Sequence, residues 1–161
     1  MSEIEKYELE KPVWKAADFE IMGWHDATIW SMAVVCEQFE LLFDIDYIFQ
    51  WVHPVSPEQY FSFWVSPATL VFEGVQNIKV DIELDYIQQI EIADVNREGP
   101  LGAPDGSLTN WKWLVELHQG TIEFEATGFS QYIRKAPIYG SSQVLDLTTR
   151  GDISFDRQYS D

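Results

Sequence analysis

The sequence predicts an all-β fold, mainly antiparallel, in which about eight to ten strands form a sandwich or a strongly curved, partly closed barrel. Three observations lead to this prediction: alternating polarity in several short segments, turn residues between them, and the absence of long helical periodicity. In the clearest strand, residues 78–85, Ile78, Val80, Ile82 and Leu84 alternate with charged residues. Successive side chains of a strand point to opposite faces, so this segment has one buried face.

Residues 39–46 show a second alternation, with apolar residues at the odd positions and Asp44 and Asp46 on the opposite face. Gln119-Gly120 predicts a two-residue hairpin turn, which places Glu116 opposite Glu123. Short helical turns are expected within residues 12–22 or 57–60. Further strands are predicted over residues 29–36, 60–65, 69–73, 87–95, 111–118, 121–127, 129–134 and 153–155.

Residues 1–161 are predicted to form one domain, because single domains commonly hold about 100–200 residues. The charged residues 1–15 are expected to be a loosely held N-terminal arm or an edge strand. Residues 97–110 are predicted as a long loop, since three Gly and two Pro within this segment interrupt regular structure. A loop of this length is either a flexible hairpin excursion or a lid over a ligand.

The chain carries 27 acidic and 10 basic residues, and its formal net charge is −17. Nucleic acids and anionic membrane surfaces are bound by clusters of Lys and Arg, so neither is expected as a partner. The single cysteine, Cys36, cannot form an internal disulfide, and the N-terminus lacks the features of a signal peptide. We therefore expect a cytoplasmic location.

Between Lys15 and Lys79 the sequence contains no Lys or Arg but nine carboxylates. Rows of carboxylates on strand faces either keep the surface hydrated or attract a basic partner by electrostatic steering. The second interpretation predicts that a basic protein binds to these rows, whose members are Asp44, Asp46, Asp81, Glu83, Glu116, Glu123 and Glu125.

No group of residues predicts catalysis or a cofactor. His25-Asp26 is the most motif-like pair, and it is either an acid/base or metal-binding couple or a turn cap before the next strand. Asp44 and Asp46 share a strand face, as paired acids of a hydrolase would. Zinc is not expected, because one cysteine and three scattered histidines offer no ligand spacing.

Four short segments stand out along the chain: residues 24–29 (WHDATI), 67–72 (PATLVF), 113–128 and 143–145 (QVL), the last followed by Arg150. In these segments the chain resembles small bacterial β-rich proteins, some of which are immunity proteins encoded beside toxins. The resemblance extends over about residues 24–150 and implies a compact β domain that acts by binding.

These observations support a non-enzymatic, acidic protein-interaction module of the immunity type, which inhibits a basic partner. The alternative is a β domain that binds a small molecule in an aromatic-lined pocket. A hydrolase built on Asp44 and Asp46, or on His25 and Asp26, ranks third. The identity of the partner, the oligomeric state and the strand order do not follow from the sequence.

Overall fold

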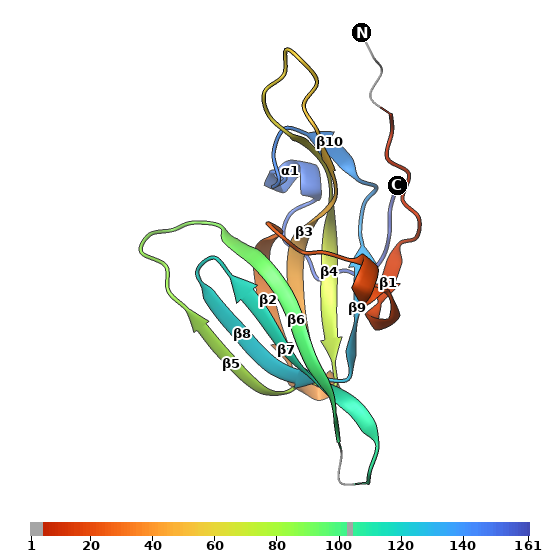
Figure 1. The fold of residues 1–161 in the computed structure, drawn as a ribbon, viewed down its shortest axis with the longest axis vertical. Helices are drawn as coiled ribbons and strands as arrows, with labels where there is room; N and C mark the ends of the chain where they lie inside the picture. The colour runs from red at the N-terminus through yellow and green to blue at the C-terminus, as the bar shows by residue number, and fades with distance from the viewer. Residues whose placement is uncertain (1–4, 103–104) are drawn as a thin grey trace.

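The computed structural model describes residues 5–102 and 105–161. These residues form ten strands in a single open sheet, in which every named strand pair is antiparallel (Figure 1). The all-β, mainly antiparallel fold is thus confirmed, and the sheet does not close into a barrel. The strands are β1 (Val13–Lys15), β2 (Thr28–Val35), β3 (Glu40–Val52), β4 (Ser62–Glu73), β5 (Gln76–Ile82), β6 (Ile90–Gly102), β7 (Leu108–Leu117), β8 (Gly120–Ala126), β9 (Gly128–Ile133) and β10 (Ile138–Gly140).

The sheet consists of two halves that share a narrow junction. Its strand order is β1-β9-β4-β3-β2-β6-β7-β8-β5, with β10 paired to β4. We call β1, β9, β4, β3, β2 and β10 the first half-sheet, and β6, β7, β8 and β5 the second half-sheet. Between β2 and β6 the ladder contains only the pairs Thr28–Glu91 and Ile29–Ile90. The β3–β4 and β6–β7 hairpins project at opposite ends of the molecule (Figure 1).

Aromatic side chains fill the space between the two half-sheets. The ring of Phe72 lies at their centre, 6.0 Å from Phe43 of the first half-sheet and 5.1 and 4.6 Å from Trp113 and Phe124 of the second. These four side chains are almost fully buried. Edge-to-face pairs of this kind add about 0.5–1.5 kcal/mol each to the free energy of burial. The packing of these rings therefore holds the two half-sheets together.

The central strands of the first half-sheet are buried on both faces. Every residue of β4 from Phe63 to Phe72 is buried. The outer face is covered by the C-terminal segment, residues 138–160, where Leu145 packs against Ile48 and Val65. Continuous apolar runs are typical of strands without a solvated face.

Pro67 accounts for a difference from the predicted strands. Residues 60–65 and 69–73 were expected to be separate strands, but Ser62–Glu73 is one strand, β4, with Pro67 inside it. Proline cannot donate a ladder hydrogen bond. At Pro67 the neighbour of β4 changes from β9, which pairs from Ala68 onward, to β10, which pairs up to Val65. The proline therefore occupies a position where the ladder is already interrupted.

Other loops and strands of the structure also differ from those predicted from the sequence. Most of the loop expected over residues 97–110 is hairpin, because β6 continues to Gly102 and β7 begins at Leu108; residues 103–104 lie outside the described part. Residues 153–155 form no strand. In the N-terminal arm, Val13–Lys15 forms the edge strand β1, which pairs with β9, and Trp14 is buried, so for this part the edge-strand alternative holds and the loosely held arm does not.

Three short helices complete the described fold: the 3-10 helices η1 (Ala16–Ile21) and η2 (Cys36–Gln38), and the α-helix α1 (Leu147–Arg150). Helix η1 lies within one of the segments expected to turn, whereas residues 57–60 contain no helix. Asp146 caps α1 by accepting a hydrogen bond from the Thr149 N–H at 2.7 Å. Among residues 5–102 and 105–161, no helix has the length and hydrophobicity needed to span a membrane.

The buried hydroxyl of Tyr47 makes the free energy of unfolding depend on pH in the alkaline range. Its oxygen accepts a hydrogen bond from the Gly23 N–H at 3.2 Å, and burial raises the pKa of Tyr47 from 10.0 to about 12. The pKa of Tyr47 is higher in the folded state than in the unfolded state. The resulting contribution to the free energy of unfolding is complete below pH 10 and is lost as the pH rises toward 12. Two pKa units correspond to roughly 3 kcal/mol.

We expect Tyr47→Phe to remove this part of the pH dependence. Urea unfolding of both proteins at pH 8, 10 and 11.5 gives the comparison. The wild type should lose more free energy of unfolding than the variant between pH 10 and 11.5. Parallel pH profiles would contradict the assignment.

Candidate functional site

Asp44 and Asp46, two of the residues predicted to bind a partner, do not lie on the molecular surface. Both are fully buried in β3, under the C-terminal segment. The alternation of residues 39–46 is real, but the face opposite the aromatic core is covered as well. The expectation that these two carboxylates are accessible to a partner or a substrate is therefore wrong.

Two arginines from distant parts of the chain neutralise these carboxylates. Arg150 donates to Asp44 Oδ1 and Oδ2 at 2.7 and 2.9 Å and, through Nε, to Asp46 Oδ1 at 3.0 Å. Arg134 donates to Asp44 Oδ1 at 2.8 Å. Desolvation alone would lower the pKa of Arg150, but Asp44 and Asp46 outweigh it and raise that pKa, so the guanidinium stays charged. We call these four residues the buried ionic cluster.

Further donors satisfy the remaining carboxylate oxygens of the buried ionic cluster. Asp44 Oδ2 accepts a hydrogen bond from the Ser154 N–H at 2.9 Å. Asp46 Oδ2 accepts from Trp30 Nε1 at 2.9 Å and from the Leu145 N–H at 2.8 Å. Leu145, Arg150 and Ser154 all belong to the C-terminal segment, so the cluster fastens this segment to the sheet. Its role is structural.

The other five predicted carboxylates gather on the second half-sheet. Strand alternation and register place Asp81, Glu116, Glu123 and Glu125 on its outer side, together with Asp94 and Glu98 of β6. Glu83 follows β5 directly and is exposed. We call this outer side, including Glu83, the acidic face. Asp94 and Glu98 were not among the residues predicted from the sequence.

The β7–β8 turn lies one residue earlier than predicted, which moves the cross-strand partner of Glu116 by two residues. The turn consists of His118-Gln119, so that Leu117 pairs with Gly120 and Glu116 with Thr121. Glu116 and Glu123 are therefore not opposite each other. Gly120 is needed not as a turn residue but for close approach of β5, because an added Cβ would overlap the carbonyl oxygen of Asp81.

Like charges nevertheless meet across the strands, at a different place. Asp94 pairs directly with Glu116, and Thr121 connects Glu116 to Asp81 on the other side. We call Asp94, Glu116 and Asp81 the carboxylate row. In the part of the chain that the structure describes, no basic side chain forms an ion pair with any of the three. Like charges directly opposite one another destabilise a sheet.

The neighbouring parts of the acidic face carry compensating charges. Lys112 of β7 lies opposite Glu98 and Glu125, and Lys79 lies opposite Glu123. The excess of negative charge is therefore concentrated at the carboxylate row, near the β7–β8 turn.

No protein-family model matches this chain, and no curated protein or solved structure matches it either. The candidate site therefore rests on its own geometry.

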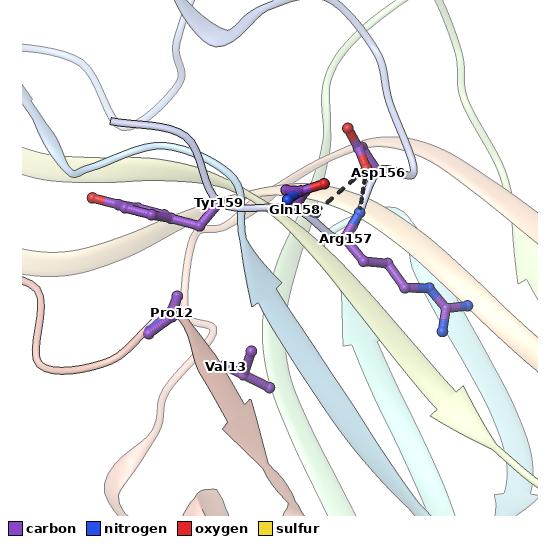
Figure 2. A pocket seen from close by; sticks show the side chains of 6 residues that line it. All are labelled: Pro12, Val13, Asp156, Arg157, Gln158 and Tyr159. Carbon is purple, nitrogen blue, oxygen red and sulfur yellow. Dashed lines mark hydrogen bonds between the residues drawn. The ribbon is translucent and has the colours of Figure 1, made fainter.

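Two open hollows lie on the described surface. One, of about 420 Å³, lies at the tip of the β3–β4 hairpin. The other, of about 490 Å³, lies between β1 and the end of the C-terminal segment (Figure 2). There the Asp156 carboxylate is engaged by the N–H groups of Arg157 and Gln158, at 2.8 and 3.4 Å. Neither hollow is lined by the aromatic core. The second is lined by Pro12, Val13, Asp156, Arg157, Gln158 and Tyr159.

The pair His25-Asp26 has neighbours that sequence spacing did not indicate. His118 Nε2 lies 3.3 Å from Asp26 Oδ1 and 3.9 Å from Glu91 Oε2. Two of the three histidines thus lie beside the same carboxylate, and the premise that they are scattered does not hold in three dimensions. Only the junction of β2 with β6 and the β7–β8 turn bring these residues together.

Removing Arg150 tests the structural role of the buried ionic cluster. We expect Arg150→Met to lower the free energy of unfolding by about 3–5 kcal/mol, because it leaves two buried carboxylates without their main counter-charge. Arg157→Met is the matched control, since Arg157 forms an ion pair with Glu40 at 2.8 Å with its side chain 41% exposed. The free energy of unfolding of Arg157→Met should fall by less than about 1 kcal/mol.

Both variants remove one positive charge, so equilibrium urea unfolding compares them at equal net charge. Equal losses for Arg150→Met and Arg157→Met would contradict a special role for the buried ionic cluster.

Proposed function

We propose that this chain is a non-enzymatic binding protein of the immunity type, whose acidic face covers a basic surface of a partner protein. The observation that carries the proposal is the carboxylate row, in which Asp94, Glu116 and Asp81 follow one another across the strands without a cation. A basic partner would supply the missing positive charge.

The chain's own architecture offers a parallel. On the outer side of the first half-sheet, Asp44 and Asp46 are met by Arg134 and Arg150. The outer side of the second half-sheet carries more carboxylates, and its neighbouring basic residues are two lysines of the same strands, Lys79 and Lys112. Arginines of a partner would act on the acidic face as the C-terminal segment acts on the first half-sheet.

Electrostatics also predicts how such a complex forms. A face with an excess of negative charge steers a basic partner and raises the association rate by about 10- to 1000-fold at low ionic strength. The Debye length is about 10 Å at 0.1 M salt, so added salt should slow association strongly. Arginine anchors would then determine how slowly the complex dissociates.

The proposal includes a reducing, cytoplasmic setting, which the exposed thiol of Cys36 supports. The small-molecule alternative ranks second, because aromatic side chains fill the space between the half-sheets and the two hollows described above are open to solvent.

A charge-matched pair of variants tests the acidic face. The face variant carries Asp81→Asn, Asp94→Asn and Glu116→Gln, and the control variant carries Glu10→Gln, Glu37→Gln and Glu58→Gln, all at exposed positions away from the face. Both lose three negative charges. We expect a basic protein captured from cells that produce this chain to be retained by the wild type and the control, and lost by the face variant.

Stopped-flow association with that purified partner provides the quantitative measurement. Raising the salt from 0.02 to 0.5 M should slow association of the wild type by at least about 10-fold. Equal retention by the two variants, or the absence of a salt-sensitive basic partner, would contradict the proposed function.

A further inference from the structure

Three potential metal ligands converge at the junction of the two half-sheets. Asp26, Glu91 and His118 each offer one ligand atom, and these atoms lie within 4.8 Å of one another. The closest separations are 3.3 Å, between His118 Nε2 and Asp26 Oδ1, and 3.9 Å, between His118 Nε2 and Glu91 Oε2. Ligand atoms about 2.0–2.2 Å from a tetrahedral Zn²⁺ are roughly 3.3–3.6 Å apart. Small side-chain shifts would therefore complete such a site.

A second histidine is oriented toward the same carboxylate. His25 Nδ1 lies 3.0 Å from the carbonyl oxygen of Ala93, and because a carbonyl only accepts, Nδ1 carries the proton. This bond directs Nε2 to within 3.6 Å of Asp26 Oδ2. In metal sites the ligating histidine commonly donates its other ring N–H to a carbonyl or carboxylate, which fixes the tautomer. His25 has this arrangement.

Backbone hydrogen bonds hold the ligand-bearing segments in place. The Asp26 N–H donates to the Ile92 carbonyl at 2.7 Å, and the His118 N–H donates to the Glu91 carbonyl at 2.9 Å. Gln143 donates to Asp26 Oδ2 at 3.0 Å, which leaves Oδ1 directed toward His118. The ligand positions therefore follow from the sheet junction and do not depend on a mobile loop.

We propose that Asp26, Glu91 and His118 bind a divalent transition metal, best matched by Zn²⁺, and that His25, which lies outside the set of ligand atoms within 4.8 Å of one another, moves to supply the fourth ligand through Nε2. Imidazole nitrogen and carboxylate oxygen together suit Zn²⁺ better than Ca²⁺ or Mg²⁺, which take oxygen ligands. Four protein ligands make the site structural, because catalytic zinc sites keep one position for water. The metal would link the turn before β2, the start of β6 and the β7–β8 turn.

The experiment uses the full chain without a purification tag and with Zn²⁺ alone as the probe. Isothermal titration gives stoichiometry and affinity, and visible absorption of Co²⁺ in the same site reports four-coordinate geometry. The variants are His118→Ala, His25→Ala and Asp26→Asn; asparagine tolerates the positive φ of 65° at this position. His53→Ala is the matched control, because His53 lies next to Phe61 in the β3–β4 hairpin.

We expect one Zn²⁺ per chain, with equal affinity for the wild type and His53→Ala. Each of the other three variants should weaken binding by about 10- to 100-fold. Zn²⁺ should raise the melting temperature of the wild type and of His53→Ala but not that of His118→Ala. Circular dichroism without metal checks that each variant is folded.

Two results would overturn the proposal: a wild type that binds no Zn²⁺ at millimolar concentration, or a loss of affinity in His53→Ala equal to that in His118→Ala. In the first case the contact between His118 and Asp26 is only a hydrogen bond, and in the second Zn²⁺ binds to surface histidines at random. The carboxylate row does not take part in this site. The face variant Asp81→Asn, Asp94→Asn and Glu116→Gln should retain the bound metal. A failure of the metal-binding proposal can therefore be distinguished from a failure of the proposed partner binding.

Discussion

The burial of two carboxylates with two arginines is the constraint on which the remaining architecture depends. Asp44 and Asp46 lie on the outer face of β3, where water would ordinarily hydrate them. Arg150 and Arg134 replace that water, and residues that accompany Arg150 in sequence cover the face. Leaving a buried charge unpaired costs several kcal/mol, so the C-terminal segment is held where the arginines are needed. As a result the central strands β3 and β4 have no solvated face, whereas Asp81 and Asp94 on the outer face of the second half-sheet are exposed.

How well the sequence predicts the environment of each strand depends on whether solvent or another part of the chain covers its outer face. Alternation in residues 78–85 predicted the edge strand β5, but the strand ends at Ile82, and Val80, which was expected on the buried face, is 45% exposed. The same pattern in residues 39–46 identified β3 but led to the wrong environment for Asp44 and Asp46. Polarity shows that a face is not hydrophobic core, but it does not distinguish water from a guanidinium 106 residues away in the chain. One signal did point to burial: the long apolar run of β4 next to β3, which is typical of strands covered on both faces.

The positions of the candidate sites depend on strand register and tertiary contacts, which sequence periodicity does not reveal. Placing Gly120 in the turn put the turn one residue too late and paired Glu116 with Glu123 in place of Thr121, two residues away. The close approach of β5, which explains this glycine, is a tertiary contact that hairpin statistics do not contain. Likewise, Asp26, Glu91 and His118 come from three separate segments, so no spacing motif relates them. Residue composition predicted that carboxylates would matter for this molecule, and only the strand order decides which of them meet.

The order of the buried charges along the chain has a consequence for biosynthesis. A ribosome delivers the polypeptide from its amino end, so Asp44 and Asp46 emerge well before Arg134 and, last, Arg150. Until then the nascent β3 and β4 gain by keeping these carboxylates hydrated, because no counter-charge has yet been synthesised. Docking of the first half-sheet against its cover therefore has to wait until Arg150 has been synthesised, and the emerging chain depends on solvent in the meantime.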